Sequence, residues 1–129
     1  MVYVLDTHPI VWFVSGSPRL TSAAHTAMSD PTAQLIIPAM ALIEIRFLAA
    51  KHRIPIDMAY VQRNLISASN CTVYPIDEQV FSLIPTNLNI HDAIMVATAL
   101  VYRDIFKFPT ALITKDTDIR DSGLIQPIW

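Results

Sequence analysis

The sequence predicts an α/β domain built around a parallel β-sheet. Short segments rich in β-branched residues alternate with segments that carry apolar residues at helical spacing, and proline mostly marks the joints between them. A chain of 129 residues fits one domain and is long enough to bury a substantial core. We therefore expect a single domain over residues 1–129.

Five segments are expected to form the strands of this sheet. Each is short and largely apolar, as are strands that are buried on both faces of a parallel sheet. The segments are Val2–Asp6, Gln34–Ile37, Thr72–Ile76, Ala111–Thr114 and Gln126–Trp129.

Six segments between the strands are expected to be helical because their apolar residues recur at helical spacing. They are Pro9–Ser15, Ser22–Ser29, Ala39–His52, Asp57–Ser69, Glu78–Leu83 and Ile90–Phe106. The chain has no internal repeat, and its two glycines, Gly16 and Gly123, exclude the common glycine-rich phosphate loops.

Composition narrows the function classes. Nine Lys and Arg residues against 11 Asp and Glu residues give no broad basic field, so any nucleic acid would be held by local charge or by metal. Cys71 is the only cysteine, which excludes an internal disulfide and fits a core-filling role in a reducing cytoplasm. We expect neither a signal peptide nor a membrane span, because charged residues interrupt the apolar zones.

Acidic residues fall where this fold gathers ligands. In an open parallel sheet, ligands bind beyond the carboxyl ends of the strands, and Asp6 ends the first predicted strand. Thr114 and Asp116 follow the fourth strand and emerge at the same edge. Asp92 lies in the first turn of a crossover helix that begins at that edge, where the helix dipole favours an anion. Glu44, roughly 7 Å along the helix after the second strand, also reaches it.

Each acid also has a structural explanation. Asp6 and Asp116 are common turn or cap residues, and Asp92 fits a capping arrangement with Asn89 as the N-cap. Glu44 is harder to explain in this way, because an unpaired carboxylate on an apolar helix face is costly. Its neighbours three and four positions away are Met40, Ala41, Phe47 and Leu48. A bound cation is the simplest compensation for the charge.

A cluster of carboxylates without cysteine points to a hard divalent ion, Mg²⁺ or Mn²⁺. His8 and His91 lie next to acids but are expected to be hydrogen-bonded structural residues outside the metal shell. Carboxylates with one or two divalent ions suit phosphodiester hydrolysis, because the metal lowers the pKa of a bound water and offsets charge on the phosphate. Thr114 is expected to orient that water or a ligand.

Four motifs, in order and over nearly the whole chain, resemble those of the PIN-domain nucleases, and in particular the VapC-type toxins of bacterial and archaeal toxin and antitoxin pairs. They are "YVLDTHPIVWF", "ALIEIRFLA" with Glu44, "IHDAIMVATAL" with Asp92, and "LITKD" with Asp116, followed by the closing "DIRDSGLIQPIW". Each motif alone is weak, but the ordered set is specific.

The resemblance implies a three-layer α/β/α sandwich with a central parallel sheet of about five strands. It also implies Mg²⁺- or Mn²⁺-dependent endoribonuclease activity, with metal ligands that map onto Asp6, Glu44, Asp92 and Asp116. The Ser or Thr that the family carries near the last acid falls on Thr114. The partners implied are an RNA substrate, a protein antitoxin and a second copy of the chain in a homodimer.

Two features extend this assignment. Asp118 is a candidate to assist or replace Asp116, because the spacing of acids after "LIT" varies among such sequences. Four basic residues are candidates for a local rim that holds RNA, but ordinary solvated surface is the favoured interpretation for them. These residues are Lys51, Arg53, Lys115 and Arg120.

The hydrophobic fraction of 53% independently favours a partner chain. The predicted helix over Ala39–Ala50 carries apolar residues on several faces, so we expect two such helices to pair in a C2 homodimer. The alternative is that the next helix, Asp57–Ser69, covers the outer face within one chain.

Two other functions remain open from the sequence. One is a noncatalytic PIN-like module that binds RNA or a protein and uses the acids only for structural metal. The other, less favoured, is a phosphoacceptor receiver domain with Asp77 after its third strand. That reading lacks the usual acidic pair at the first strand and leaves Glu44 unexplained.

Overall fold

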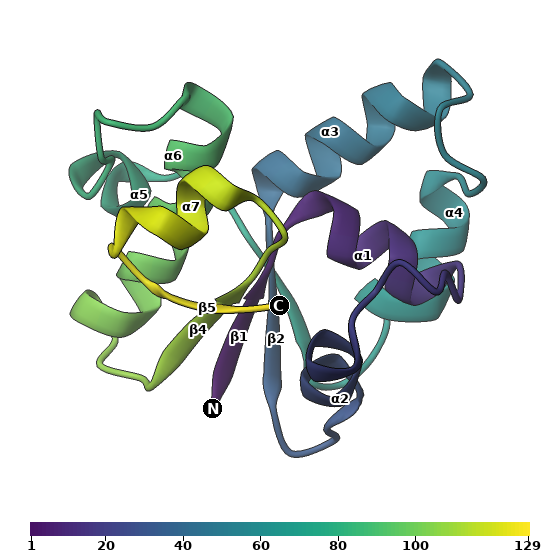
Figure 1. Ribbon diagram of the computed structural model, residues 1–129, viewed down its shortest axis with the longest axis horizontal. Coiled ribbons are helices and arrows are strands. Elements are labelled where there is room, and N and C mark those ends of the chain that lie inside the picture. Colours follow the sequence, from purple (N-terminus) through teal and green to yellow (C-terminus); the bar gives the residue numbers. More distant parts are fainter.

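A five-stranded, fully parallel sheet forms the centre of the protein, as a computed structural model of residues 1–129 shows (Figure 1). The strands lie in the order β3-β2-β1-β4-β5. Their bounds are β1 (Val2–Leu5), β2 (Gln34–Pro38), β3 (Cys71–Tyr74), β4 (Thr110–Ile113) and β5 (Gln126–Ile128). The predicted parallel sheet and its five strands are therefore confirmed.

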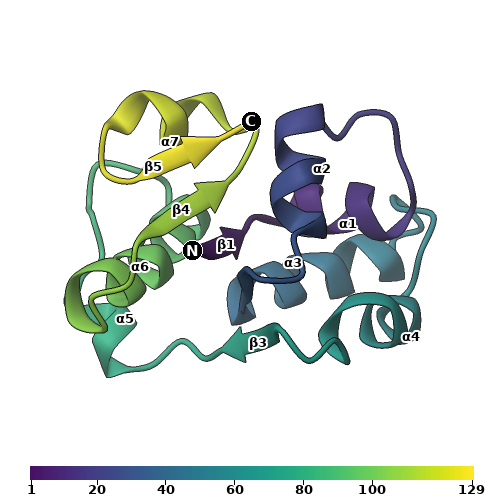
Figure 2. The same ribbon diagram turned by 90° about the horizontal axis from the view of Figure 1, so that it is seen from below.

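Helices cover both faces of this sheet (Figure 2). One group comprises α1 (Thr7–Val14), α2 (Ser22–Ser29), α3 (Ala39–Ala50), α4 (Met58–Val61) and the π-helical turn η1 (Gln62–Ile66). The other group comprises α5 (Glu78–Ser82), α6 (Ile90–Leu100), the π-helical turn η2 (Val101–Ile105) and α7 (Thr117–Ser122). The architecture is the expected three-layer α/β/α sandwich.

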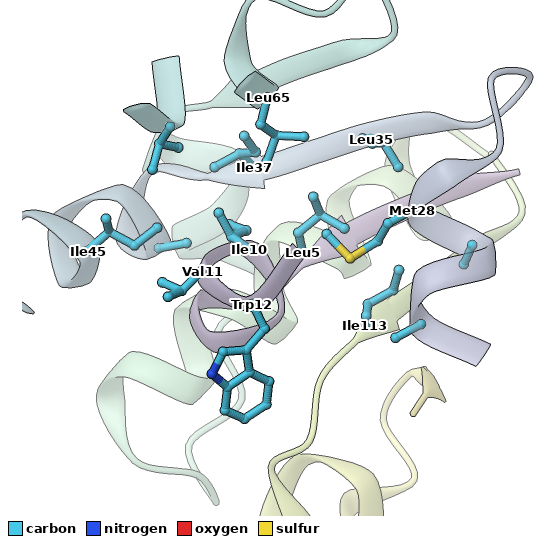
Figure 3. Close-up of a cluster of buried hydrophobic side chains, with 14 of the residues drawn as sticks. Leu5, Ile10, Val11, Trp12, Met28, Leu35, Ile37, Ile45, Leu65 and Ile113 are labelled. Carbon is cyan, nitrogen blue, oxygen red and sulfur yellow. The ribbon is translucent and has the colours of Figure 1, made fainter. Parts of the chain in front are cut away.

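Two hydrophobic clusters, one on each face of the sheet, hold the layers together. Along β1, Val2 and Val4 join the cluster under α5, α6 and α7, whereas Leu5 joins the cluster under α1 to α4. This alternation follows from the two-residue period of a strand. Figure 3 shows the second of these clusters, with Trp12 at its rim.

The predicted elements differ from the observed ones mainly at their ends. The first helix begins at Thr7 rather than at Pro9, because Asp6 already acts as its N-cap. The helix over Thr117–Ser122 was not predicted, since only one of its residues, Ile119, is buried and its apolar period is therefore too weak to detect. None of the helices has the length and apolar character needed to span a bilayer.

The pairing of β1 with β4 brings two distant parts of the chain side by side. Leu5 lies opposite Ile113 in the parallel register, and the Asp6 N–H donates to the Ile113 carbonyl over 3.0 Å. Because α1 and α7 begin just beyond these strands, their first residues share one edge of the sheet (Figure 1).

Because of the core under α1 to α4, substitutions at two neighbouring residues of α3 should differ clearly in their effect on the free energy of unfolding. Ile45 is fully buried, whereas Arg46 is exposed. Ile45→Ala should lower the free energy of unfolding by about 2–5 kcal/mol, because it leaves a cavity in that core. Arg46→Ala, the control, should change the free energy by less than about 0.5 kcal/mol. Urea unfolding measures both, and an equal effect of the two substitutions would contradict this view of the core.

Candidate active site

The side chain of Asp6 is fixed at the carboxyl end of β1 by two hydrogen bonds. Its Oδ1 accepts from the Thr7 N–H over 2.7 Å, and its Oδ2 accepts from the Thr114 Oγ1 hydroxyl over 2.6 Å. Thr114 Oγ1 in turn accepts the Asp116 N–H over 3.0 Å. The fully buried Thr114 therefore links the ends of β1 and β4 and sets the direction of the Asp6 carboxylate.

Asp92 occupies the first turn of α6, as the sequence predicts. Asn89 is the N-cap: its Oδ1 accepts the Asp92 N–H over 3.0 Å, and its Nδ2 donates to Asp92 Oδ2 over 2.7 Å. The amide of Asn89 thus orients this carboxylate through one oxygen and leaves the other without a hydrogen bond to protein.

Three carboxylates form a compact group. One oxygen each from Asp92, Asp116 and Asp118 lies within 4.8 Å of the other two. Asp116 is the N-cap of α7, with Oδ1 accepting the Ile119 N–H over 3.0 Å, and Asp118 lies in the first turn of the same helix. The structure therefore brings Asp118 to the group beside Asp116 rather than in its place.

Glu44 approaches the same site from α3, which packs against both α1 and α6. Burial raises the pKa of this half-buried carboxyl, the charges of Asp6 and Asp92 raise it further, and His91 opposes them. The neighbouring Thr7 hydroxyl is also close enough to lower the pKa of Glu44. By distance and angle, however, that buried hydroxyl has no hydrogen-bond partner.

The electrostatics of the site are those of uncompensated negative charge. Burial is the largest cause that raises the pKa of Asp6 and of Asp92, and in both cases the charge of Asp116 adds to it. The one salt bridge in the structure joins Arg103 to Asp104, and none involves these acids. Five carboxylates thus converge without a Lys or Arg partner.

The donor set fits a hard divalent cation. All five acids offer oxygen atoms, the class of ligand that Mg²⁺ and Mn²⁺ prefer. The buried Thr7 hydroxyl, which lies beside Asp6 and Glu44 and has no partner, is the kind of polar atom that a metal-bound water satisfies. The residues able to hold such an ion are Asp6, Glu44, Asp92, Asp116 and Asp118.

A group of positive side chains lies beside the acids, around Trp12 of α1. Lys115 Nζ lies 5.1 Å and Arg19 Cζ lies 6.0 Å from the centroid of the Trp12 ring. The His8 ring is 5.4 Å from the same indole, and burial, then Lys115, lowers the pKa of His8 despite the opposing charge of Asp6. His8 is therefore disfavoured as a cation here, and its place outside the metal shell stays a prediction.

The four candidate residues of a basic rim are divided among three places, with Arg120 exposed on α7. Lys115 joins the group around Trp12, and Arg53 lines a pocket that also contains Trp12 and Arg19. Lys51 instead lines a separate groove with Glu44. Sequence reasoning missed Arg19, which lies in the connection between α1 and α2 where no periodic pattern points to it.

Asp77, the residue that a receiver domain would phosphorylate, lies apart from the acidic group. It is the N-cap of α5 at the edge strand β3, and its Oδ2 accepts the Tyr74 hydroxyl over 2.6 Å. Capping and this hydrogen bond account for its presence, so the structure offers no support for a receiver domain.

Comparisons with known proteins agree with this geometry. The solved structures that share the fold include VapBC2 from Rickettsia felis bound to a DNA fragment from its promoter. Its TM-score is 0.68 at 13% identity, and the match covers 98% of this chain and 97% of that one. They also include VapBC-1 from nontypeable Haemophilus influenzae, with TM-score 0.63, 15% identity and coverage of 98% of this chain and 96% of that one. No protein of curated function matches the sequence. A sequence profile of the PIN domain matches residues 3–123. This chain therefore belongs to the PIN domain family.

Proposed function

We propose that residues 1–129 form a single nuclease domain that hydrolyses RNA phosphodiester bonds with Mg²⁺ or Mn²⁺. The observation that carries the proposal is the convergence of Asp6, Glu44, Asp92, Asp116 and Asp118 without a Lys or Arg partner. Such a cluster raises the free energy of the metal-free protein, because like charges that lie close together and are partly shielded from water repel. A bound divalent ion removes that penalty, and membership of the PIN domain family supports the same chemistry.

Each residue of the site has a definite task in this proposal. Asp92, Asp116 and Asp118 would hold an ion through the oxygens that approach one another, and Asp6 and Glu44 would be further ligands. Thr114 is a positioning residue, since its hydroxyl donates to Asp6 and accepts from the backbone of Asp116. When bound, the divalent ion supplies a water of lowered pKa and offsets charge on the phosphate.

We also propose that the chain is a VapC-type toxin with a protein antitoxin, acting in the cytoplasm. The two similar solved structures are both VapBC complexes that match this chain over almost its whole length. The single unpaired Cys71 is compatible with a reducing compartment. Inspection of the adjacent reading frame for a small DNA-binding protein would identify the antitoxin.

A homodimer through α3 is the remaining part of the proposal. α4 packs against α3, yet Ile43 and Phe47 stay 43% and 61% exposed, so cover from within the chain is incomplete. Together with Met40, Glu44, Lys51 and His91 they line a groove of about 430 Å³ along α3, which reaches the acidic site at Glu44. Pairing of two such surfaces would remove this apolar area from water.

The first prediction tests catalysis. The protein should cleave single-stranded RNA in Mg²⁺ or Mn²⁺ but not in EDTA, and Asp6→Asn or Asp92→Asn should abolish cleavage because each removes a charged ligand. Asp121→Asn, on the exposed side of α7, is the matched control and should leave the rate unchanged. A labelled RNA resolved on a denaturing gel provides the measurement.

The chemical ends of the RNA products distinguish the mechanisms by which the phosphodiester bond can be broken. Hydrolysis in which water adds to phosphorus and the 3′ oxygen leaves gives 5′-phosphate and 3′-hydroxyl ends, so a 2′,3′-cyclic phosphate would overturn the mechanism. Equal cleavage in excess EDTA would refute metal dependence. A protein that binds RNA and metal but never cleaves would instead be the noncatalytic PIN-like module.

The second prediction concerns stability without metal. The pKa of Glu44 is raised in the folded state. The stability that this group contributes is therefore fully present at pH values below the ordinary glutamate pKa. It is lost as the pH rises through the raised pKa. At pH 7 in EDTA, Glu44→Gln should therefore melt at a higher temperature than the wild type, and the difference should shrink as the pH is lowered towards 4.

Magnesium and a second glutamate provide the controls for this experiment. Mg²⁺ should raise the melting temperature of the wild type more than that of Glu44→Gln, because the variant has lost a ligand. Glu78→Gln, in the exposed first turn of α5, should not raise the melting temperature, since an acid is favourable there. A Glu44→Gln variant that melts below the wild type in EDTA would show that the carboxylate stabilises the metal-free fold.

The third prediction concerns the oligomeric state. Light scattering at micromolar concentration should give twice the chain mass of 14.4 kDa, and Phe47→Glu should shift the protein towards the monomer by placing a charge in the apolar contact. Ile76→Glu, at an exposed apolar residue outside α3, is the control. A constant mass near 14.4 kDa on concentration would rule out the dimer.

A further inference from the structure

A pocket of about 290 Å³ lies between α1 and the segment that follows α3. His8 and Trp12 line it from α1, Ser15, Ser17 and Arg19 line it from the end of that helix onward, and Arg53 faces them from beyond α3. Its size is close to the lower end of the range for small-ligand pockets, about 300–1,000 Å³. The pocket therefore suits one small group rather than a folded partner.

The charges at this pocket are positive and unpaired. Arg19 and Arg53 both line it, and Lys115 reaches over the Trp12 ring at its border. None of these three cations forms a salt bridge, although the chain has a formal net charge of −2. Two guanidinium groups with the hydroxyls of Ser15 and Ser17 are donors that match an oxyanion.

The pocket adjoins the acidic centre through the chain itself. His8 follows Asp6 by two residues at the start of α1, and Lys115 stands between Thr114 and Asp116. The charges of Asp6, Lys115 and Arg19 all act on the His8 ring, so the pocket and the acids lie on either side of this residue. A polyanion with one phosphate at the carboxylates would then pass Lys115 and reach the two arginines. A negatively charged strand has no such path across the acids alone, because they repel it.

We propose that this pocket binds a phosphate of the RNA strand next to the phosphodiester that is cleaved, with Arg19 and Arg53 as its ligands. The inference rests on the proposed function and adds to it a site that positions the strand on one side of the metal centre. An acidic peptide offers carboxylates to the same donors. The repeated phosphates of RNA fit better, since the pocket continues from the place where a phosphate reacts.

The direct test is RNA binding in EDTA, where no divalent ion at the acids holds the strand and the basic pocket supplies the attraction. The probe is a fluorescent single-stranded RNA oligonucleotide, and anisotropy gives Kd over a range of KCl concentrations. The double variant Arg19→Ala/Arg53→Ala should bind roughly tenfold more weakly. The slope of log K against log salt should become shallower by about 0.7 for the one phosphate lost.

Two control variants distinguish the loss of positive charge in the pocket from a loss of the folded structure. Arg63→Ala, at an exposed arginine on η1 outside the pocket, should match the wild type in both Kd and slope. Arg19→Lys/Arg53→Lys keeps both charges, so it should recover most of the salt slope while losing the bidentate contact. Both arginines are exposed, and equal melting temperatures of all variants verify the fold.

A second measurement locates the phosphate along the strand. Cleavage substrates that carry one uncharged methylphosphonate at successive positions should show one sensitive position beside the scissile bond in the wild type. In the double alanine variant, kcat/KM should already be low, and that substitution should reduce it no further. Additive losses at every position would overturn the inference.

The outcomes distinguish this inference from the proposed function. Wild-type protein that binds and cleaves RNA, with an unchanged Kd and slope in the double alanine variant, refutes the phosphate site and leaves the nuclease intact. Loss of antitoxin binding with full RNA affinity in that variant would likewise overturn it and assign the pocket to an acidic peptide. Wild-type protein that neither binds nor cleaves RNA refutes both proposals.

Discussion

The parallel pairing of β1 with β4 is the constraint on which the rest of the site depends. It places Leu5 opposite Ile113 and so brings Asp6 within 2.6 Å of the Thr114 hydroxyl, from more than a hundred residues away in the chain. α1 follows β1, α7 follows β4, and α6 packs against both strands. Without this pairing, Asp6 and Asp116 would have no common edge at which to meet.

The same residues serve the fold and the proposed chemistry. Asp6 caps α1, Asp116 caps α7, and Asp92 lies in the capped first turn of α6. Capping satisfies backbone N–H groups at helix starts and partly offsets the burial of each carboxylate. It does not neutralise the charge, because burial still raises the pKa of Asp6 and Asp92. Hydrogen bonds therefore fix the positions of these carboxylates, but their negative charge is left without a Lys or Arg partner.

The small net charge of the chain conceals a strong separation of charge. Five acids meet at one edge of the sheet, and unpaired cations gather around Trp12 beside them. A uniform surface of the same composition would neither attract a divalent ion nor guide a polyanion. Binding of metal by the acids and of phosphate by the cations are thus two halves of one proposed RNA site, arranged along α1.

The sequence by itself determined the features that depend on near neighbours in the chain. Strand segments, the helix that carries Asp92, the Asn89 cap and the four acids at strand and helix ends all follow from local periodicity and capping chemistry. Only the tertiary structure decided the place of Asp118 beside Asp92, the approach of Arg19 to Trp12, and the exposure of Phe47. These depend on which strands pair and how helices pack across them, and such contacts between distant residues leave no periodic trace in the sequence.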